Sequence, residues 1–127
     1  MEEVVDRFLE AFNRGDFDGI RDVLDDSLVA FVTTEDGDHV VMHGAEAYVD
    51  SLREMLTSAP TRYSVVFTQQ PVPVDDDRML VMLEIRASRG GRILHNYSAQ
   101  LFRFAGQRIS EITMTDAKPR ESARFWA

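Results

Sequence analysis

The chain has 127 residues, no cysteine and a formal net charge of −8 at pH 7, from 14 Lys and Arg against 22 Asp and Glu. The length predicts one domain over residues 1–127. The acidic balance argues against nucleic acid and anionic membranes as partners, because both attract basic surfaces. Without cysteine there is no disulfide, thiol nucleophile or thiolate metal ligand. The sequence has neither an apolar run of about 18 residues nor a basic leader before an apolar stretch, so we expect a cytoplasmic protein with no membrane contact.

Apolar periodicity predicts helices in the first half of the chain and mostly strands in the second. In the first helix, Val4, Phe8 and Phe12 recur at helical spacing. In chain order, the predicted elements are helices 1–14 and 17–25, strands 27–34 and 39–42, a helix 44–57, and strands 62–70, 79–88, 92–104 and 108–116. No element is predicted for the tail, 117–127. Helices followed by a run of antiparallel strands are typical of the α+β class.

Alternation in the strands predicts which side chains face inward. One face of 79–88 is wholly apolar and includes Met79 and Val81. Strand 92–104 instead places three uncharged polar residues, Asn96, Ser98 and Gln100, on one face. Such residues fill a core poorly and are less charged than an ordinary solvent face, so we interpret them as a semi-polar cavity lining. The alternative is a polar row facing solvent.

If that row faces a cavity, the opposite face of the same strands is a large apolar patch for a monomer. A symmetric homodimer through this convex sheet face is the preferred interpretation. The alternative is that the tail covers the patch with Phe125 and Trp126. The residues of the patch are Leu80, Met82, Tyr97, Ala99 and Leu101.

Several motifs, taken in order, carry a family resemblance. The segment from Val4 to Ile20, with Asn-Arg-Gly-Asp-Phe-Asp-Gly-Ile at 13–20, looks like a helical-hairpin opening, and Leu-Phe-Arg-Phe at 101–104 and Ile-Ser-Glu-Ile at 109–112 follow. Together they resemble SnoaL-like, ketosteroid-isomerase-like proteins of the nuclear-transport-factor-2-like superfamily. The resemblance implies a cone-shaped α+β barrel, in which a strongly bent antiparallel sheet packs on three helices from the N-terminal half. It also implies an apolar pocket and a dimer through the convex face.

The resemblance does not extend to the residues of ketosteroid isomerisation. That chemistry uses a tyrosine, a protonated aspartate and an aspartate base. The matching positions in this chain hold Phe8, Gln100 and Phe31. The phenylalanines transfer no proton, and the amide donates a hydrogen bond but is no acid. We therefore do not expect a ketosteroid isomerase that works by the family mechanism.

Asp116 is the candidate catalytic residue. Similar cyclases and epoxide hydrolases carry an aspartate at the end of the last strand, facing the pocket, and Asp116 matches that place. A carboxyl group among apolar neighbours suits general acid/base work. The epoxide hydrolases also need an arginine and a second aspartate in the cavity, whereas parity places Arg86 and Arg103 on the outer face. The alternative role for Asp116 is to end the strand before Pro119.

The other polar residues form no recognisable centre. His39, His43 and His95 lack the spacing of a metal site, so no metal or cofactor is expected. The residues expected to bind a ligand are Phe8, Phe12, Phe31, Leu52, Met55, Met79, Val81, Leu83, Asn96, Ser98, Gln100 and Met114.

These observations leave three functions open. The first is a cofactor-independent isomerase, cyclase or hydrolase that uses Asp116 on a small hydrophobic molecule, such as a polyketide, terpenoid or steroid-like compound. The second is a binding module that leaves its small ligand unchanged. The third is a dimeric interaction domain that works mainly through the convex face.

Overall fold

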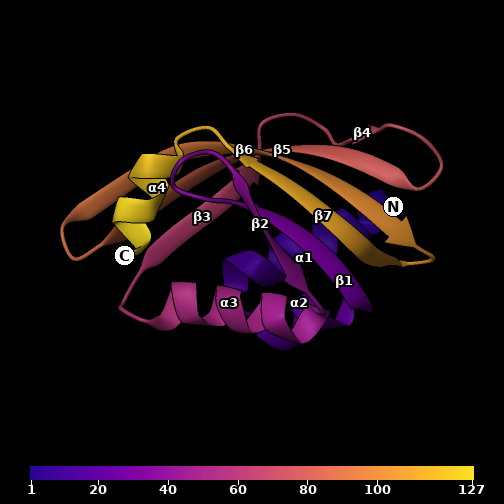
Figure 1. The fold of residues 1–127 in the computed structure, drawn as a ribbon, viewed down its shortest axis with the longest axis horizontal. Helices are drawn as coiled ribbons and strands as arrows, with labels where there is room; N and C mark the ends of the chain where they lie inside the picture. Colours follow the sequence, from indigo (N-terminus) through magenta and orange to yellow (C-terminus); the bar gives the residue numbers. More distant parts are fainter.

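The computed structural model describes residues 1–127 and shows a curved sheet with helices gathered under its concave side (Figure 1). The helices are α1 (Glu2–Arg14), α2 (Phe17–Asp22), α3 (Ala45–Thr57) and α4 (Pro119–Trp126). The strands are β1 (Leu24–Thr33), β2 (His39–His43), β3 (Arg62–Phe67), β4 (Val72–Pro73), β5 (Arg78–Arg89), β6 (Arg92–Ala105) and β7 (Arg108–Asp116). No helix combines the length and apolar character needed to cross a membrane.

The sheet runs in the order β2-β1-β7-β6-β5-β3, and the short β4 also pairs with β5. All pairs are antiparallel except β1 with β7, which is parallel. The sheet bends strongly but does not close, so β2 and β3 remain its edges (Figure 1). The α+β class and the bent sheet packed on helices are therefore confirmed.

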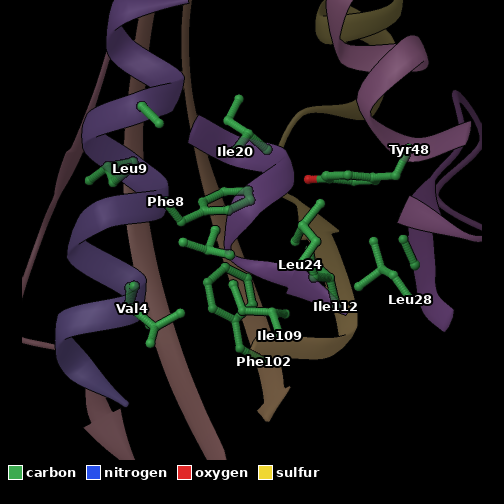
Figure 2. Close-up of a cluster of buried hydrophobic side chains, with 14 of the residues drawn as sticks. Val4, Phe8, Leu9, Ile20, Leu24, Leu28, Tyr48, Phe102, Ile109 and Ile112 are labelled. Carbon is green, nitrogen blue, oxygen red and sulfur yellow. The ribbon is translucent and has the colours of Figure 1, made fainter. Parts of the chain in front are cut away.

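The main core fills the space between α1 and the middle of the sheet (Figure 2). Phe8 of α1 meets Phe102 of β6 edge to face, with ring centroids 5.6 Å apart. Ile109 and Ile112 of β7 are almost fully buried beside them. Each such side chain contributes about 1.5–3 kcal/mol by leaving water, so this contact fixes α1 against the concave face.

The turn between α1 and α2 follows the sequence signals. Gly15 ends α1 in the left-handed region, with φ 66°. The side chain of Asp16 caps α2 by accepting a hydrogen bond from Gly19 N at 2.9 Å. Just before the turn, Asn13 donates to Val65 O at 2.7 Å and accepts from Val65 N at 2.8 Å. The end of α1 is therefore hydrogen-bonded to the edge strand β3.

Several elements differ from the prediction, among them the second helix and strand β3. The second helix stops at Asp22 instead of residue 25, because Leu24 pairs with Ile109 and the amide of Ile109 donates to Val23 O at 2.8 Å. Pairing with β7 therefore draws the end of the predicted helix into β1. Strand β3 is also shorter than predicted and ends at Phe67.

The tail forms a fourth helix, α4, which the sequence analysis missed. Its proline, Pro119, stands in the first turn, where it costs no helical hydrogen bond. Phe125 is buried against Ala87 and Leu94, which both lie on the concave side of the β5–β6 hairpin. Figure 1 shows α4 at the end of that hairpin. The alternative in which the tail covers the convex patch is therefore wrong.

Candidate functional site

A cavity of about 170 Å³ lies between the concave face of the sheet and the helices α1, α3 and α4. Fourteen of its 20 lining residues are hydrophobic, so its walls are mostly apolar. The hydrophobic ones are Phe8, Leu9, Phe12, Val32, Tyr48, Leu52, Met55, Tyr63, Val65, Leu83, Ile85, Leu94, Met114 and Trp126. The polar ones are Ser51, Asn96, Ser98, Gln100, Asp116 and Ser122.

The polar wall comes from neighbouring positions on β6 and β7. Asn96, Ser98 and Gln100 alternate along β6 and share its concave face, as predicted. Ser98 pairs directly with Asp116 across the two strands. The amide of Asn96 donates to Asp116 Oδ1 at 2.6 Å, while Gln100 Nε2 lies 3.4 Å from Ser98 Oγ. The predicted polar row and Asp116 therefore meet in one place.

Asp116 is oriented by backbone and side-chain bonds. Its Oδ1 accepts hydrogen bonds from Asn96 Nδ2 and from the backbone N of Lys118 at 2.8 Å. Its own backbone N donates to Thr33 Oγ1 at 3.1 Å, and that hydroxyl donates to Met114 O. Two donors on one oxygen fix the orientation of the carboxyl group. The other oxygen, Oδ2, takes part in none of these bonds.

Two further polar groups line the cavity, Gln100 in the same wall as Asp116 and Tyr48 in the opposite, helical wall. Gln100 Oε1 is buried and has no hydrogen-bond partner. Tyr48 extends from α3 toward Phe8 and Ile20 (Figure 2), and burial raises the pKa of its phenol. Tyr48 therefore stays protonated and is a neutral hydrogen-bonding group in the helical wall.

Ten of the predicted site residues line the cavity: Phe8, Phe12, Leu52, Met55, Leu83, Asn96, Ser98, Gln100, Met114 and Asp116. Three do not. Met79 and Val81 point to the concave side as expected, but they are 4% and 1% exposed within the packed core. Phe31 lies on the convex face, because its neighbours Ala30 and Val32 are the ones that face inward.

Several lining residues were not predicted from the sequence. Tyr48 lies on the apolar stripe of the third helix but was not included in the site. Ser122 comes from α4, which was not predicted, and so does Trp126, whose aromatic ring had been considered as a possible part of the lining. A proline followed by apolar residues at helical spacing was the signal available for that helix.

The remaining candidates lie apart from the cavity. His39 Nε2 is 2.8 Å from Met114 O, and His95 Nε2 is 2.7 Å from Glu84 Oε2. Arg86 pairs with Glu84, and Arg103 with Asp77, at the outer surface. The structure therefore places both arginines outside the cavity, as parity predicted.

The convex face carries an apolar row that crosses five strands. The register joins Val41 to Phe31, Phe31 to Thr113, Thr113 to Leu101 and Leu101 to Leu80. A second row joins Ala99 to Met82, and Tyr97 beyond it is 41% exposed. All five residues predicted for the dimer patch therefore lie on this face.

Comparisons with known proteins agree with this architecture. A family model described as a SnoaL-like domain matches residues 5–112. The uncharacterised Mycobacterium tuberculosis protein Rv0034 is 26% identical over 125 residues, which are 98% of this chain and 95% of the relative.

Solved structures are similar over nearly the whole chain. Bal32a, from a soil-derived mobile gene cassette, has a TM-score of 0.86 at 21% identity and covers 98% of this chain and 95% of its own. An LEH-like epoxide hydrolase from M. tuberculosis has a TM-score of 0.76 at 18% identity and covers 97% and 89%. At these identities the likeness concerns the fold, and the predicted family resemblance is confirmed.

Proposed function

Because this chain belongs to the SnoaL-like domain family, we propose that its cavity binds a small, mostly apolar molecule on which Asp116 acts as an acid/base group. The reaction class is isomerisation, cyclisation or hydrolysis without a cofactor. The observation that carries the proposal is an oriented carboxylate with one uncommitted oxygen in the wall of a mostly apolar cavity. The similarity in fold to an epoxide hydrolase is consistent with hydrolysis, although no arginine lines this cavity.

The hydrogen bonds to Asp116 leave one oxygen free for work as a base. The donors Asn96 Nδ2 and Lys118 N both bond to Oδ1. Asp116 Oδ2 then accepts a proton from a carbon acid or from an attacking water. Tyr48, whose phenol keeps its proton because burial raises its pKa, supplies a donor for negative charge that develops on a substrate oxygen.

The cavity volume limits the size of the molecule. At about 170 Å³ it is close to the roughly 150 Å³ cavity that holds benzene. It is smaller than the 300–1,000 Å³ or so of pockets that take drug-sized ligands. The proposed ligand is therefore monocyclic or of similar size, and smaller than the steroid-like compounds expected from the sequence.

Two monocyclic probes test the chemistry. Cyclohexene oxide reports hydrolysis to the diol, and an unconjugated cyclohexenone reports proton transfer to the conjugated ketone. We expect turnover of at least one probe, and Asp116→Asn to lower kcat by about 100-fold or more. Asparagine keeps an oxygen for both donors, so the fold should persist. Glu111→Gln, on the convex face of the same strand, is the matched control. Equal turnover by Asp116→Asn and the wild type would contradict the role of Asp116.

The second candidate function is binding without catalysis. It is favoured by the residues at positions 8 and 100, where Phe8 and Gln100 replace the acids of the related isomerases. It predicts that both probes bind, for example by chemical-shift changes at cavity residues, and are recovered unchanged. Turnover above the rate in buffer would exclude it.

We also propose that the convex face forms a homodimer. The apolar row through Phe31, Leu101 and Leu80 supports this, because such a face is unusual on a monomer surface. The chain's last helix packs on the opposite side and leaves this row uncovered. A two-fold axis through the sheet would bring two copies of the row together. Sedimentation equilibrium should give twice the mass of the chain.

A further inference from the structure

The cavity lining has an unbalanced set of charges. Asp116 is the only acidic residue among the lining residues, and none of them is Lys, Arg or His. Asp116 also takes part in none of the ion pairs of the structure. The nearby ammonium group of Lys118 donates to His95 O at 3.0 Å. The cavity wall therefore carries a negative charge that no protein cation neutralises.

The side-chain atoms of this wall that lack a hydrogen-bond partner are acceptors. Asp116 Oδ2 accepts none of the bonds that hold the carboxylate, and Gln100 Oε1 is a buried acceptor without a partner. Gln100 pairs with Met114, two residues before Asp116, so the two side chains are diagonal neighbours on one face. Gln100 Oε1 is sealed within the protein, whereas Asp116 Oδ2 is accessible in a residue that lines the cavity, so Oδ2 is the acceptor that a donating ligand meets.

The rest of the lining suits a cation with an apolar body. Aromatic rings of Phe8, Phe12, Tyr48 and Trp126 line the cavity. Ring faces attract organic cations, especially where water is excluded. The net charge of −8 further raises the concentration of cations near the protein.

We propose that the cavity takes a small protonated amine, whose ammonium group lies against Asp116 Oδ2 and whose ring or short branched chain fills the apolar part. This inference rests on the proposed function and names the ligand class of the same cavity. A neutral epoxide or ketone offers Oδ2 no donor and leaves it free to act as the base of the proposed function. An alcohol offers one donor and no charge, whereas an ammonium group offers three donors and the missing positive charge.

Three probes of the same size separate these classes. Benzylamine, benzyl alcohol and ethylbenzene each place one small group beside the same ring, and only the first is cationic at pH 7. Titrations of the purified full chain, followed by amide chemical shifts, give an affinity for each probe. We expect benzylamine to bind about tenfold or more tightly than ethylbenzene, which corresponds to about 1.4 kcal/mol, with benzyl alcohol between them.

Two variants locate the source of the preference. Asp116→Asn should lower the affinity for benzylamine about tenfold or more and leave that for ethylbenzene within about threefold. Asparagine can still accept from Asn96 and Lys118, so a folded variant is expected, and its amide spectrum checks this. Glu111→Gln, which removes a charge from the convex face, should change none of the three affinities.

The outcomes distinguish this inference from the proposed function. Equal or tighter binding of ethylbenzene or benzyl alcohol would overturn the amine assignment while the apolar cavity stands. An amine preference that survives in Asp116→Asn would also overturn it, because the cation would then be held elsewhere. Absence of binding by all three probes would overturn both the amine assignment and the proposed ligand-binding function.

Discussion

Arg89, at the end of β5, holds α4 against the rest of the molecule. The residue is only 4% exposed. Its Nε donates to Thr61 Oγ1 at 2.7 Å and its Nη2 to Met55 O at 2.5 Å, near the end of α3. Its Nη1 reaches Trp126 O at 3.4 Å, and the guanidinium lies 5.1 Å from the centre of the Trp126 ring. A buried cation is therefore satisfied by three uncharged acceptors and one aromatic face.

The geometry gives the expected cost of removing this cation. A hydrogen bond from a charged donor contributes about 1.5–3 kcal/mol, whereas a contact at 3.4 Å contributes little. Arg89→Met keeps most of the packed stem but loses two short bonds and the contact with the ring. In the wild type, burying the guanidinium costs the hydration that it has in the unfolded chain, and this cost offsets part of the free energy of those bonds. We expect a loss of about 3 kcal/mol in the free energy of unfolding, or roughly 10 °C in Tm.

Trp126 provides a direct assay, because it is the only tryptophan in the chain. In Arg89→Met its fluorescence emission should shift to the red as α4 loosens, before the sheet unfolds by circular dichroism. Arg92→Met is the matched control: Arg92 belongs to the same hairpin, is exposed, and donates to Arg124 O at 2.9 Å. It should cost less than about 0.5 kcal/mol. If Arg89→Met leaves Tm within about 2 °C and the emission unchanged, the assignment of Arg89 as the residue that holds α4 is wrong.

Three further predictions concern other parts of the molecule. Asn13→Ala removes both bonds to the backbone of Val65 and should cost about 2 kcal/mol in chemical denaturation; a change below about 0.5 kcal/mol would show that water replaces the amide. Leu101→Arg, in the centre of the convex row, should halve the mass found by sedimentation, and an unchanged dimer would place the interface elsewhere. The hydrogen bond from Arg78 lowers the pKa of Asp75 to about 2, so Arg78→Gln should move that pKa, measured by NMR titration, back toward 3.8. Because this pKa is depressed in the folded state, the pair stabilises the fold above about pH 4 and loses that contribution as the pH falls toward 2.

The sheet was predictable where its strands alternate. On β5 and β6 the buried residues lie on the concave face, whereas Leu80 and Tyr97 lie on the convex face. Alternation therefore predicted both faces correctly. On β1 the residues from 28 to 32 are all apolar, and alternation is absent. Phe31 was placed in the pocket by its match to the base position of the related isomerases, and the sequence of this strand offered no alternation to correct that placement. The structure explains the pattern, because the inner side faces the core and the outer side belongs to the convex row.

The end of the chain was not predictable from local preferences. A helix of eight residues is marginal by itself. It is stabilised by contacts with distant residues, through Phe125 against Leu94 and through Arg89 beneath Trp126. Since Ser122 and Trp126 complete the cavity lining, the same gap in prediction left one wall of the site undescribed.

The polar row was predictable from the sequence, but the hydrogen bonds between its side chains and Asp116 were not. Asn96 Nδ2 donates to Asp116 Oδ1 across a separation of 20 residues. Only the folded sheet shows that this bond uses one carboxylate oxygen and leaves Asp116 Oδ2 free. The ammonium group of Lys118 donates to His95 O. If it paired with Asp116 instead, the two charges would cancel and the cavity wall would suit a neutral ligand. With the ammonium group engaged elsewhere, the excess of acceptors favours a base in catalysis and a cation in binding. Both roles use the same free oxygen, so an amine held by its ammonium group on Oδ2 uses Asp116 for recognition, whereas a neutral substrate leaves Oδ2 free to accept a proton.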